Sequence, residues 1–424
     1  MRLSFLLRCV DRSLSSVKPL HNVRVVDLTR VLAGPFATML LGDLGADVIK
    51  IEKPGSGDDT RSWGPPFVGD NSTYFLSVNR NKKSVAVDIK HPDGQQILQQ
   101  LISQSDVVVE NFIPGKLDSL GLGYSSITTY NPSIIYCSIS GYGPTGPYAK
   151  RAGYDVIASA VGGLMNITGP HDGEPAKVGV AITDLATGLY AQGAIMAALL
   201  HRQTTGKGQK IDCNLLSTQV ACLVNVASAY LNAEVEPRRW GTAHANIVPY
   251  EAFRTAGGSP IVVGAGNNQH FDILCNVMGV EHLKSDERFS DNSKRVQHRT
   301  QLISELANRF LELTTGEWLD RLDGCGIPYG PINTMEQVFT DPQVRHSQLV
   351  REIEQNDGNR VHIIGHPVQY SDVDPEVRLP PPLLGEHTEE ILLSTLGYDR
   401  DTVDTLNKSR TIQLHAGEKF TTAA

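Results

Sequence analysis

A strand–helix–strand pattern that begins at residue 23 constrains the fold of this chain more than any other feature. The run VRVVDLT (23–29) is rich in Val and is typical of a buried strand. LAGPFATMLLGDLG (32–45) follows, with apolar residues at helical spacing and Gly at its end. ADVIKIE (46–52) predicts a second strand. Two strands joined by a helix within about 30 residues predict a βαβ unit in a parallel sheet.

The same alternation continues along the chain. Strands are expected over residues 83–90, 106–112 and 133–140, with a helix over residues 91–103. We therefore expect an α/β fold whose large domain, residues 23–215, is a doubly wound, Rossmann-like sheet with helices on both faces.

The remaining segments predict a second, smaller α/β domain. The strand-like run 261–267 and helical patterns near residues 298–313 and 316–324 support it. A Pro-rich stretch then suggests that the chain returns to the large domain. The expected divisions are a leader over 1–22, the large domain over 23–215, a linker over 216–240, the small domain over 241–345, a return linker with the C-terminal part of the large domain over 346–412, and a tail over 413–424.

Charge and composition exclude some partners. Asp and Glu outnumber Lys and Arg by 46 to 38, and the chain has no basic tail, so we expect no nucleic-acid partner. No apolar run approaches the roughly 18 residues of a membrane span, so we expect no membrane partner. The six cysteines form no CxxC pair, so we expect no metal site.

The first 22 residues differ from the rest because they hold four basic residues against one acidic residue, together with several serines. A leader that is Arg-rich, Ser-rich and poor in acids resembles a mitochondrial transit peptide. It predicts a location in the mitochondrial matrix, and the alternative is a disordered leader of a cytosolic protein.

Several common chemistries lack their sequence motifs. The turn after the first strand reads TRVLAGP (29–35), without the GxGxxG of dinucleotide-binding domains. A P-loop ending in GK[ST], an HExxH motif and a GxSxG motif are also absent. Hydride transfer, nucleotide hydrolysis and metal-assisted hydrolysis therefore lack their usual residues.

Specific motifs resemble the class III CoA-transferases, a group that includes formyl-CoA transferase and the related α-methylacyl-CoA racemases. The resemblance is carried by RVVDLTRVLAGPFATMLLGDLGADVIKIEKPGSGDDTR (24–61), NRNKKSVAVDIK (79–90), DVVVENFIPG (106–115), GYGPTGPY (141–148), GYDVIASAVGGLMNITG (153–169) and TDLATGLYAQGAIMAALLHRQTTGKGQKIDCNL (183–215). It covers nearly the whole chain after the leader.

The resemblance implies a homodimer of two ring-shaped chains interlocked like links. It implies CoA transfer from succinyl-CoA to a dicarboxylic acid such as 3-hydroxy-3-methylglutarate or glutarate. The CoA thioesters are substrates, and we expect no permanently bound cofactor. Exchange of one thioester for another needs no ATP, which agrees with the missing P-loop.

Asp184 occupies the position of the family's nucleophilic aspartate. It precedes a helical run, where an Asp is a natural N-cap and where the helix dipole favours the charged form. A structural cap is the alternative to the nucleophile. As nucleophile, Asp184 would form an aspartyl-CoA thioester, and glycine-rich segments such as GYG (141–143) are candidates for stabilising the oxyanions.

Asp155 in GYDVIAS matches an acidic position near the nucleophile of the transferases, and the alternative is a helix cap. By the same resemblance, the racemases carry a GHD motif where this chain has GYD, and a racemase needs two acid/base groups, one of them the His of that motif. Here Tyr154 replaces that His, and a phenol is a poor base at neutral pH. This substitution favours a transferase over a racemase.

CoA carries several phosphate charges, and a basic stretch lies between residues 50 and 90. Its members are Lys50, Lys53, Arg61, Arg80, Lys82, Lys83 and Lys90. Phosphate binding would explain this density, and solvated surface charge is the alternative. By resemblance, the residues that contact CoA are Leu32, Ala33, Lys53, Val87, Asp88, Ile89, Lys90, Asn111, Phe112, Ala152, Gly153 and Tyr154.

Three further arginines are candidates for the acid substrate. Arg238, Arg239 and Arg254 flank the segment WGTAHANIVPY (240–250), and any of them is suited to hold the distal carboxylate of a dicarboxylic acid. Surface arginines without this role are the alternative. Two other functions stay open at this point: an α-methylacyl-CoA racemase-like enzyme and a non-catalytic CoA-binding protein.

Overall fold

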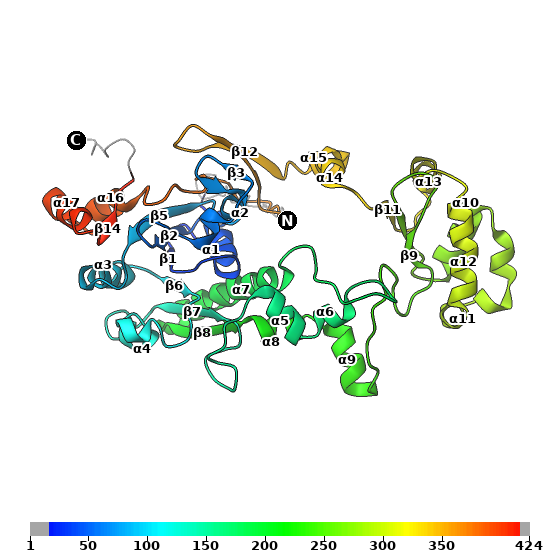
Figure 1. Ribbon diagram of the computed structural model, residues 1–424, viewed down its shortest axis with the longest axis horizontal. Coiled ribbons are helices and arrows are strands. Elements are labelled where there is room, and N and C mark those ends of the chain that lie inside the picture. Colours follow the sequence, from blue (N-terminus) through cyan, green and yellow to red (C-terminus); the bar gives the residue numbers. More distant parts are fainter. Residues whose placement is uncertain (1–16, 416–424) are drawn as a thin grey trace, which may run out of the picture. The chain divides into compact units, whose positions relative to one another are not determined.

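A computed structural model describes residues 17–415, and this part of the chain divides into two compact units (Figure 1). The first unit holds residues 17–164, 178–228 and 348–415. The second unit holds residues 165–177 and 229–347. The segment 216–240, which the sequence suggested as a linker, contains α8 (Leu215–Ala221) and α9 (Val224–Ala233).

The first unit is built on a sheet of seven strands in the order β14-β5-β2-β1-β6-β7-β8. The strands are β1 (Arg24–Asp27), β2 (Asp47–Glu52), β5 (Lys82–Val87), β6 (Val107–Glu110), β7 (Ile135–Ser140), β8 (Gln209–Asn214) and β14 (Ile412–Gln413). Six of them are parallel, and β14 joins β5 antiparallel at the edge. This is the strand order of a doubly wound α/β sheet with one added strand, so the predicted fold class is confirmed.

Helices cover both faces because the strands are apolar on both sides. In β6, Val107 and Val109 pack toward α1 (Ala33–Asp43) and α7 (Ile182–Thr205). Val108 packs on the opposite face, toward α3 (Pro92–Ser103) and α17 (Arg400–Lys408). Three consecutive buried valines are typical of a parallel strand that is covered on both sides.

The remaining elements of the first unit are short. They include β3 (Phe67–Val68), β4 (Asn71–Ser72), α2 (Thr73–Ser77), α4 (Tyr124–Ile127), α5 (Asp155–Val161), β12 (Val350–Glu354), β13 (Arg360–Ile364) and α16 (Thr388–Glu390). The short helix α6 (Leu164–Ile167) begins at the last residue of this segment of the first unit, and its other residues belong to the second unit. β12 and β13 form an antiparallel pair, as do β3 and β4.

The chain joins the fold before residue 23. Leu20 is buried in the same core cluster as α1, and its N–H donates to the carbonyl of Leu44. Lys18 forms an ion pair with Glu376. The folded body therefore begins before residue 22, where the sequence suggested that the leader ends, because Lys18 and Leu20 have partners in it. The rest of the leader, residues 1–16, lies outside the described residues, as does the tail from residue 416.

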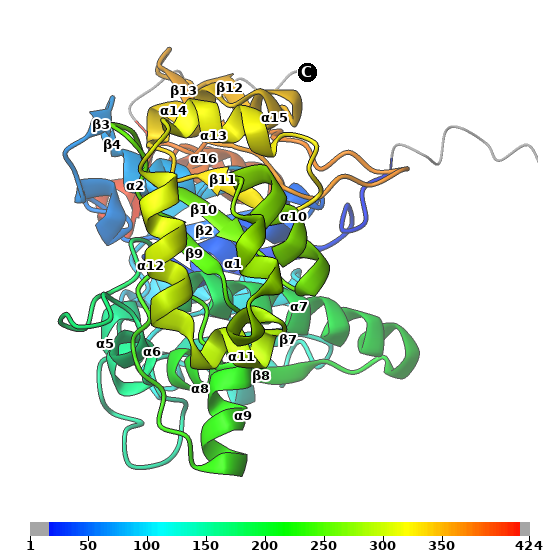
Figure 2. The ribbon, with the colours of Figure 1, turned by 90° about the vertical axis from the view of Figure 1, so that its right-hand side faces the viewer.

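The second unit has its own core around an antiparallel sheet, β11-β10-β9. Its strands are β9 (Tyr250–Phe253), β10 (Ile261–Gly264) and β11 (Tyr329–Pro331). Its helices are α10 (Asn268–Met278), α11 (Asn292–Gln297), α12 (Arg299–Phe310), α13 (Thr315–Leu322), α14 (Met335–Thr340) and α15 (Pro342–His346), which Figure 2 shows in yellow-green and yellow. Trp318 is fully buried and donates from Nε1 to the carbonyl of Phe310.

Within residues 17–415, no single helix has the length and hydropathy of a membrane span. One bent pair, α8 with α9, meets that criterion only when the two helices are taken together.

Candidate active site

The strand order places a cavity at the carboxyl edge of the sheet. The chain leaves β1 toward β2 and β5 on one side, and returns through β6, β7 and β8 on the other. In such sheets, the loops after the two diverging strands separate and leave a crevice. Here the loop after β1 and the loop after β6 both line a cavity of about 250 Å³.

Asp184 lines this cavity from the start of α7. Asp184 is only 8% exposed to solvent. The expected N-cap role is wrong, because α7 begins two residues earlier and its N-cap residue is Ala181, which makes no side-chain cap. Among the described residues, no group donates a hydrogen bond to the Asp184 carboxylate, so its oxygens are open to the cavity.

Asp155 supplies the missing cap. Its Oδ1 accepts from the N–H of Thr183 at 3.0 Å and from the N–H of Asp184 at 3.4 Å. Asp155 itself lies at the start of α5. The Thr183 hydroxyl further donates to Gln219 at 2.7 Å. The start of α7, and with it Asp184, is thus held by groups from two other helices.

The environment raises the pKa of Asp184 to about 7. Burial is the larger cause, and the charge of Asp155 is the second. This differs from the sequence-based expectation that the helix dipole would favour the carboxylate. The reason is that the N–H groups of Thr183 and Asp184, at the start of α7, donate to Asp155 rather than to the Asp184 carboxylate. A carboxylate without hydrogen-bond donors is poorly solvated and is correspondingly reactive as a nucleophile.

The loop after β1 contributes open N–H groups to the same cavity. Leu32 and Ala33 line the cavity at the N-terminus of α1, which has no side-chain cap and no acidic residue in its first turn. Their N–H groups have no acceptor among the described residues. The positive end of a helix with free N–H groups is suited to stabilise an oxyanion.

Glycines let the cavity walls come close together. A side chain on Gly188 of α7 would lie 2.8 Å from the carbonyl oxygen of Ala33, so α7 and α1 meet there backbone to backbone. Gly141 and Gly153 face each other in the same way. Gly141 lines the cavity, whereas the N–H of Gly143 already donates to Ser140. Of the GYG segment, Gly143 is therefore engaged within the loop.

Most of the residues that the family resemblance assigned to CoA lie together. Seven of them line the cavity with Asp184: Leu32, Ala33, Asn111, Phe112, Ala152, Gly153 and Tyr154. The Asn111 side chain also forms two hydrogen bonds with the loop after β1. Its amide oxygen accepts from the N–H of Arg30, and its Nδ2 donates to the carbonyl of the same residue.

The other predicted CoA contacts lie outside the cavity lining. Lys53 follows β2, and Val87 to Lys90 span the end of β5, so both groups are at the carboxyl edge of the same sheet. Lys53 and Lys90 are exposed. Asp88 is engaged locally, since its carboxylate accepts from the N–H of Lys90, and Ile89 packs against the core.

The interpretation of residues 50–90 as a phosphate-binding surface is wrong for four of its seven members. Lys50, Arg61, Arg80 and Lys82 are buried in ion pairs with Asp58, Glu52, Asp43 and Asp27, respectively. Lys83 pairs with Glu390. Buried cations need a carboxylate partner, so this stretch is basic because it supplies internal ion pairs.

Sequence reasoning missed two arginines that line the cavity. Arg30 lies in the loop after β1, and its guanidinium pairs with Asp59 at 2.9 Å. Arg151 lies over the ring of Tyr148, 3.8 Å from its centroid. The sequence signal that could have found them is proximity along the chain: Arg151 immediately precedes Ala152, and Arg30 lies two residues before Leu32.

The three arginines predicted for the acid substrate belong to the second unit. Arg239 donates to the carbonyls of Gly173 and Asn166 and therefore has structural partners. Arg238 lies over the ring of Trp240, and Arg254 is exposed. A role in binding the acid stays a prediction for all three.

Comparison with known proteins identifies the family of this chain. Residues 20–388 match the model of CoA-transferase family III. The chain is 56% identical over 400 residues to a succinyl-CoA:glutarate CoA-transferase of Mus musculus, covering 94% of this chain and 92% of the relative. It is 55% identical over 402 residues to the protein of that name from Homo sapiens, covering 95% and 92%. Among solved structures, a CAIB/BAIF family protein from Brucella suis is 42% identical with a TM-score of 0.80, covering 88% of this chain and 98% of that one.

Proposed function

The chain belongs to CoA-transferase family III, and we propose that it moves CoA from succinyl-CoA to glutarate with Asp184 as the nucleophile. The observation that carries the proposal is the Asp184 carboxylate, which is buried, free of donors and open to a cavity that also holds open N–H groups. The names of the two mammalian relatives support the choice of acids.

The reaction would proceed by four acyl transfers. The Asp184 carboxylate attacks the thioester carbonyl of succinyl-CoA, giving a mixed anhydride and the CoA thiolate. The thiolate then attacks the Asp184 carbonyl, which forms the aspartyl-CoA thioester and releases succinate. Glutarate attacks this thioester, giving a second anhydride and the thiolate again. The thiolate finally takes the glutaryl group and frees Asp184, so one thioester is exchanged for another.

Each transfer passes through a tetrahedral oxyanion that needs hydrogen-bond donors. The N–H groups of Leu32 and Ala33 are suited to this role because they have no acceptor among the described residues and lie in the same cavity as Asp184. Asp155 would act indirectly, by capping α7 and by raising the pKa of Asp184.

The acceptor acid can be tested directly. Incubation of the purified protein with succinyl-CoA and either glutarate or 3-hydroxy-3-methylglutarate should give the corresponding new CoA thioester and free succinate, as measured by liquid chromatography. We expect Asp184→Ala to abolish both products. Failure to form glutaryl-CoA would contradict the substrate assignment.

A racemase-like reaction is distinguished in the same samples. It would incorporate deuterium from D₂O at the carbon next to the thioester without exchanging acids. Tyr154 lines the cavity at the position that corresponds to the racemase His. The side chain at this position is therefore a phenol rather than an imidazole. We expect acid exchange without deuterium incorporation.

We also propose that the protein works as a homodimer, as the family resemblance implies. Large apolar side chains are exposed along α7 and α8, among them Leu189, Tyr190, Leu200 and Val220. A surface of this kind is typical of a protein interface. Sedimentation equilibrium should give a mass near twice the 46.1 kDa of the chain, and a monomer at micromolar concentration would contradict the proposal.

Import into mitochondria is the third part of the proposal. It rests on the basic, Ser-rich composition of the leader. A fusion of residues 1–22 to a fluorescent protein should reach mitochondria, and a diffuse signal would contradict the proposal.

A further inference from the structure

We propose that Asp58 is a positioning residue for the transfer reaction, because its carboxylate fixes the backbone conformation of Val31 and thereby aims the N–H groups of Leu32 and Ala33 at the cavity. The proposal rests on the function given above, in that it assigns these N–H groups to the oxyanions. Asp58 lines no part of the cavity and is only 1% exposed, so it acts through the loop rather than on the substrate.

Val31 has an unusual backbone. Its φ is +72°, in the left-handed region that β-branched residues rarely adopt. Such a conformation is strained and persists only where neighbouring groups hold it. Val31 stands directly before Leu32, the N-cap residue of α1, so its conformation sets the direction in which the chain enters the helix.

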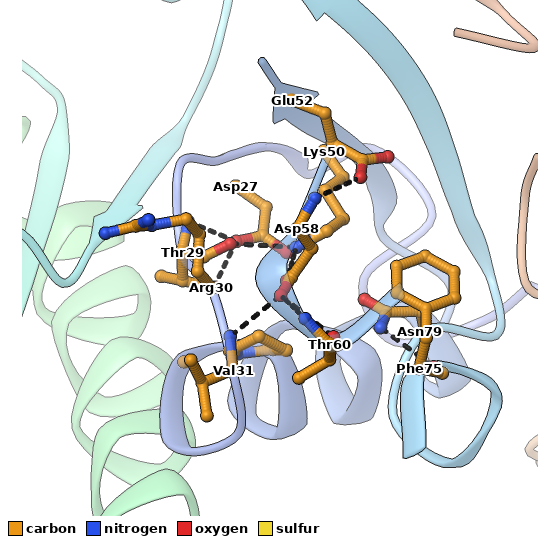
Figure 3. A network of polar contacts seen from close by, with 12 residues as sticks. Asp27, Thr29, Arg30, Val31, Lys50, Glu52, Asp58, Thr60, Phe75 and Asn79 are labelled. Atoms are coloured by element: carbon orange, nitrogen blue, oxygen red, sulfur yellow. Dashed lines mark hydrogen bonds and ion pairs between the residues drawn. The ribbon is translucent and has the colours of Figure 1, made fainter. Parts of the chain in front are cut away.

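Asp58 is the group that holds it. Figure 3 shows the Asp58 carboxylate between the backbone of Val31 and the side chain of Lys50. One carboxylate oxygen accepts from the N–H of Val31 at 3.2 Å and from the N–H and hydroxyl of Thr60 at 3.0 and 2.8 Å. The other accepts from Lys50 Nζ at 2.9 Å.

The neighbouring contacts fix the residues before Val31. Lys50 also donates to the carbonyl of Thr29 at 2.8 Å. Asp27 accepts from the N–H of Thr29 at 2.9 Å, and Asn111 holds both backbone groups of Arg30. Every residue from Thr29 to Val31 thus has its backbone tied to a side chain, and the next two residues present free N–H groups.

The charge of Asp58 is needed for this arrangement. Burial opposes ionisation, but the charge of Lys50 and the hydrogen bonds from Lys50 and Thr60 hold the pKa of Asp58 below its ordinary value. An amide in its place offers only one acceptor oxygen, which cannot serve both Val31 and Lys50. Replacing Asp58 by Asn therefore removes the acceptor from the loop or from the buried cation.

The test compares two loop variants with a matched control. Asp58→Asn changes the carboxylate, and Val31→Pro removes the N–H that Asp58 accepts and forbids the positive φ. Asp43→Asn is the control, since Asp43 is equally buried and ion-paired, with Arg80, but lies at the other end of α1. The measurements are kcat, KM for succinyl-CoA, CoA affinity by calorimetry, and melting temperature.

We expect both loop variants to lower kcat by roughly 10- to 100-fold, with KM and CoA affinity changed by less than about 3-fold. Asp43→Asn should lower the melting temperature without this loss of kcat. Equal kcat in Asp58→Asn and Asp43→Asn, or an unchanged kcat in Val31→Pro, would overturn the proposal. The Val31 variant decides the matter if Asp58→Asn does not fold.

Exchange of labelled succinate into succinyl-CoA separates this proposal from the substrate assignment. If the unaltered protein catalyses that exchange but does not use glutarate, the choice of acceptor is wrong, while the variant-to-wild-type ratios still report on Asp58.

Discussion

Asp184 and Asp155 illustrate how the site is tuned at the scale of single residues. Asp155 takes the N–H groups at the start of α7, and this leaves the Asp184 carboxylate without donors. Asp155 also adds a negative charge beside a buried acid. Both effects disfavour the charged form of Asp184, and the carboxylate that does form is correspondingly nucleophilic.

The raised pKa of Asp184 predicts the pH dependence of the reaction. Below about pH 7 the carboxyl is increasingly protonated and cannot attack. The kcat/KM for succinyl-CoA should therefore reach a plateau at alkaline pH and fall about tenfold per pH unit on the acid side.

Asp155→Asn tests the cause of that shift. The amide oxygen can still cap α7, but the negative charge is gone. The inflection of the kcat/KM profile should move to lower pH, and it should stay above the ordinary aspartate value of 3.8 because burial, the larger cause, remains. An inflection that does not move would show that Asp155 does not set the pKa of Asp184.

At the scale of elements, the contact between α7 and α1 sets the width of the site. Gly188 lies one turn after Asp184, against the carbonyl of Ala33 and the ring of Phe36. Gly188→Ala should push the helices apart, lower the stability by about 1–3 kcal/mol and reduce kcat. Denaturant unfolding and steady-state kinetics measure the two effects.

Gly193 on the same helix provides the control. Nothing lies within 4 Å of a side chain added there. Gly193→Ala should be neutral or stabilise the protein by up to about 1 kcal/mol, because Ala favours the helix. If the two variants had the same stability, the close approach at Gly188 would not matter.

The strands and helices could be predicted because their patterns are local. The valines of β6 indicate a strand covered on both faces, and the structure has one. The helix that Asp155 caps could not be predicted, since its partners are 28 and 29 residues away along the chain. Lys50 and Lys82 were misassigned for a related reason: basic density along a sequence does not show that these side chains point inward, toward Asp58 and Asp27.

At the scale of the whole molecule, the chain's entry into the fold lies closer to the N-terminus than the leader composition suggested. A protein that lacks residues 1–16 keeps Lys18 and Leu20 and serves as the reference. Removal of residues 1–22 should lower the free energy of unfolding by roughly 2 kcal/mol, because Leu20 loses its buried position in the core. Urea unfolding of the two truncated proteins measures the difference, and equal stability would contradict the structural role of residues 18–22.

The covalent intermediate tests the central claim most directly. The protein is incubated with succinyl-CoA, treated with hydroxylamine, digested and examined by mass spectrometry, with Asp184→Asn as the control. The account predicts a hydroxamate at Asp184 that depends on succinyl-CoA and is absent from the variant. A modification at another residue, or acid exchange without any modification at Asp184, would contradict it.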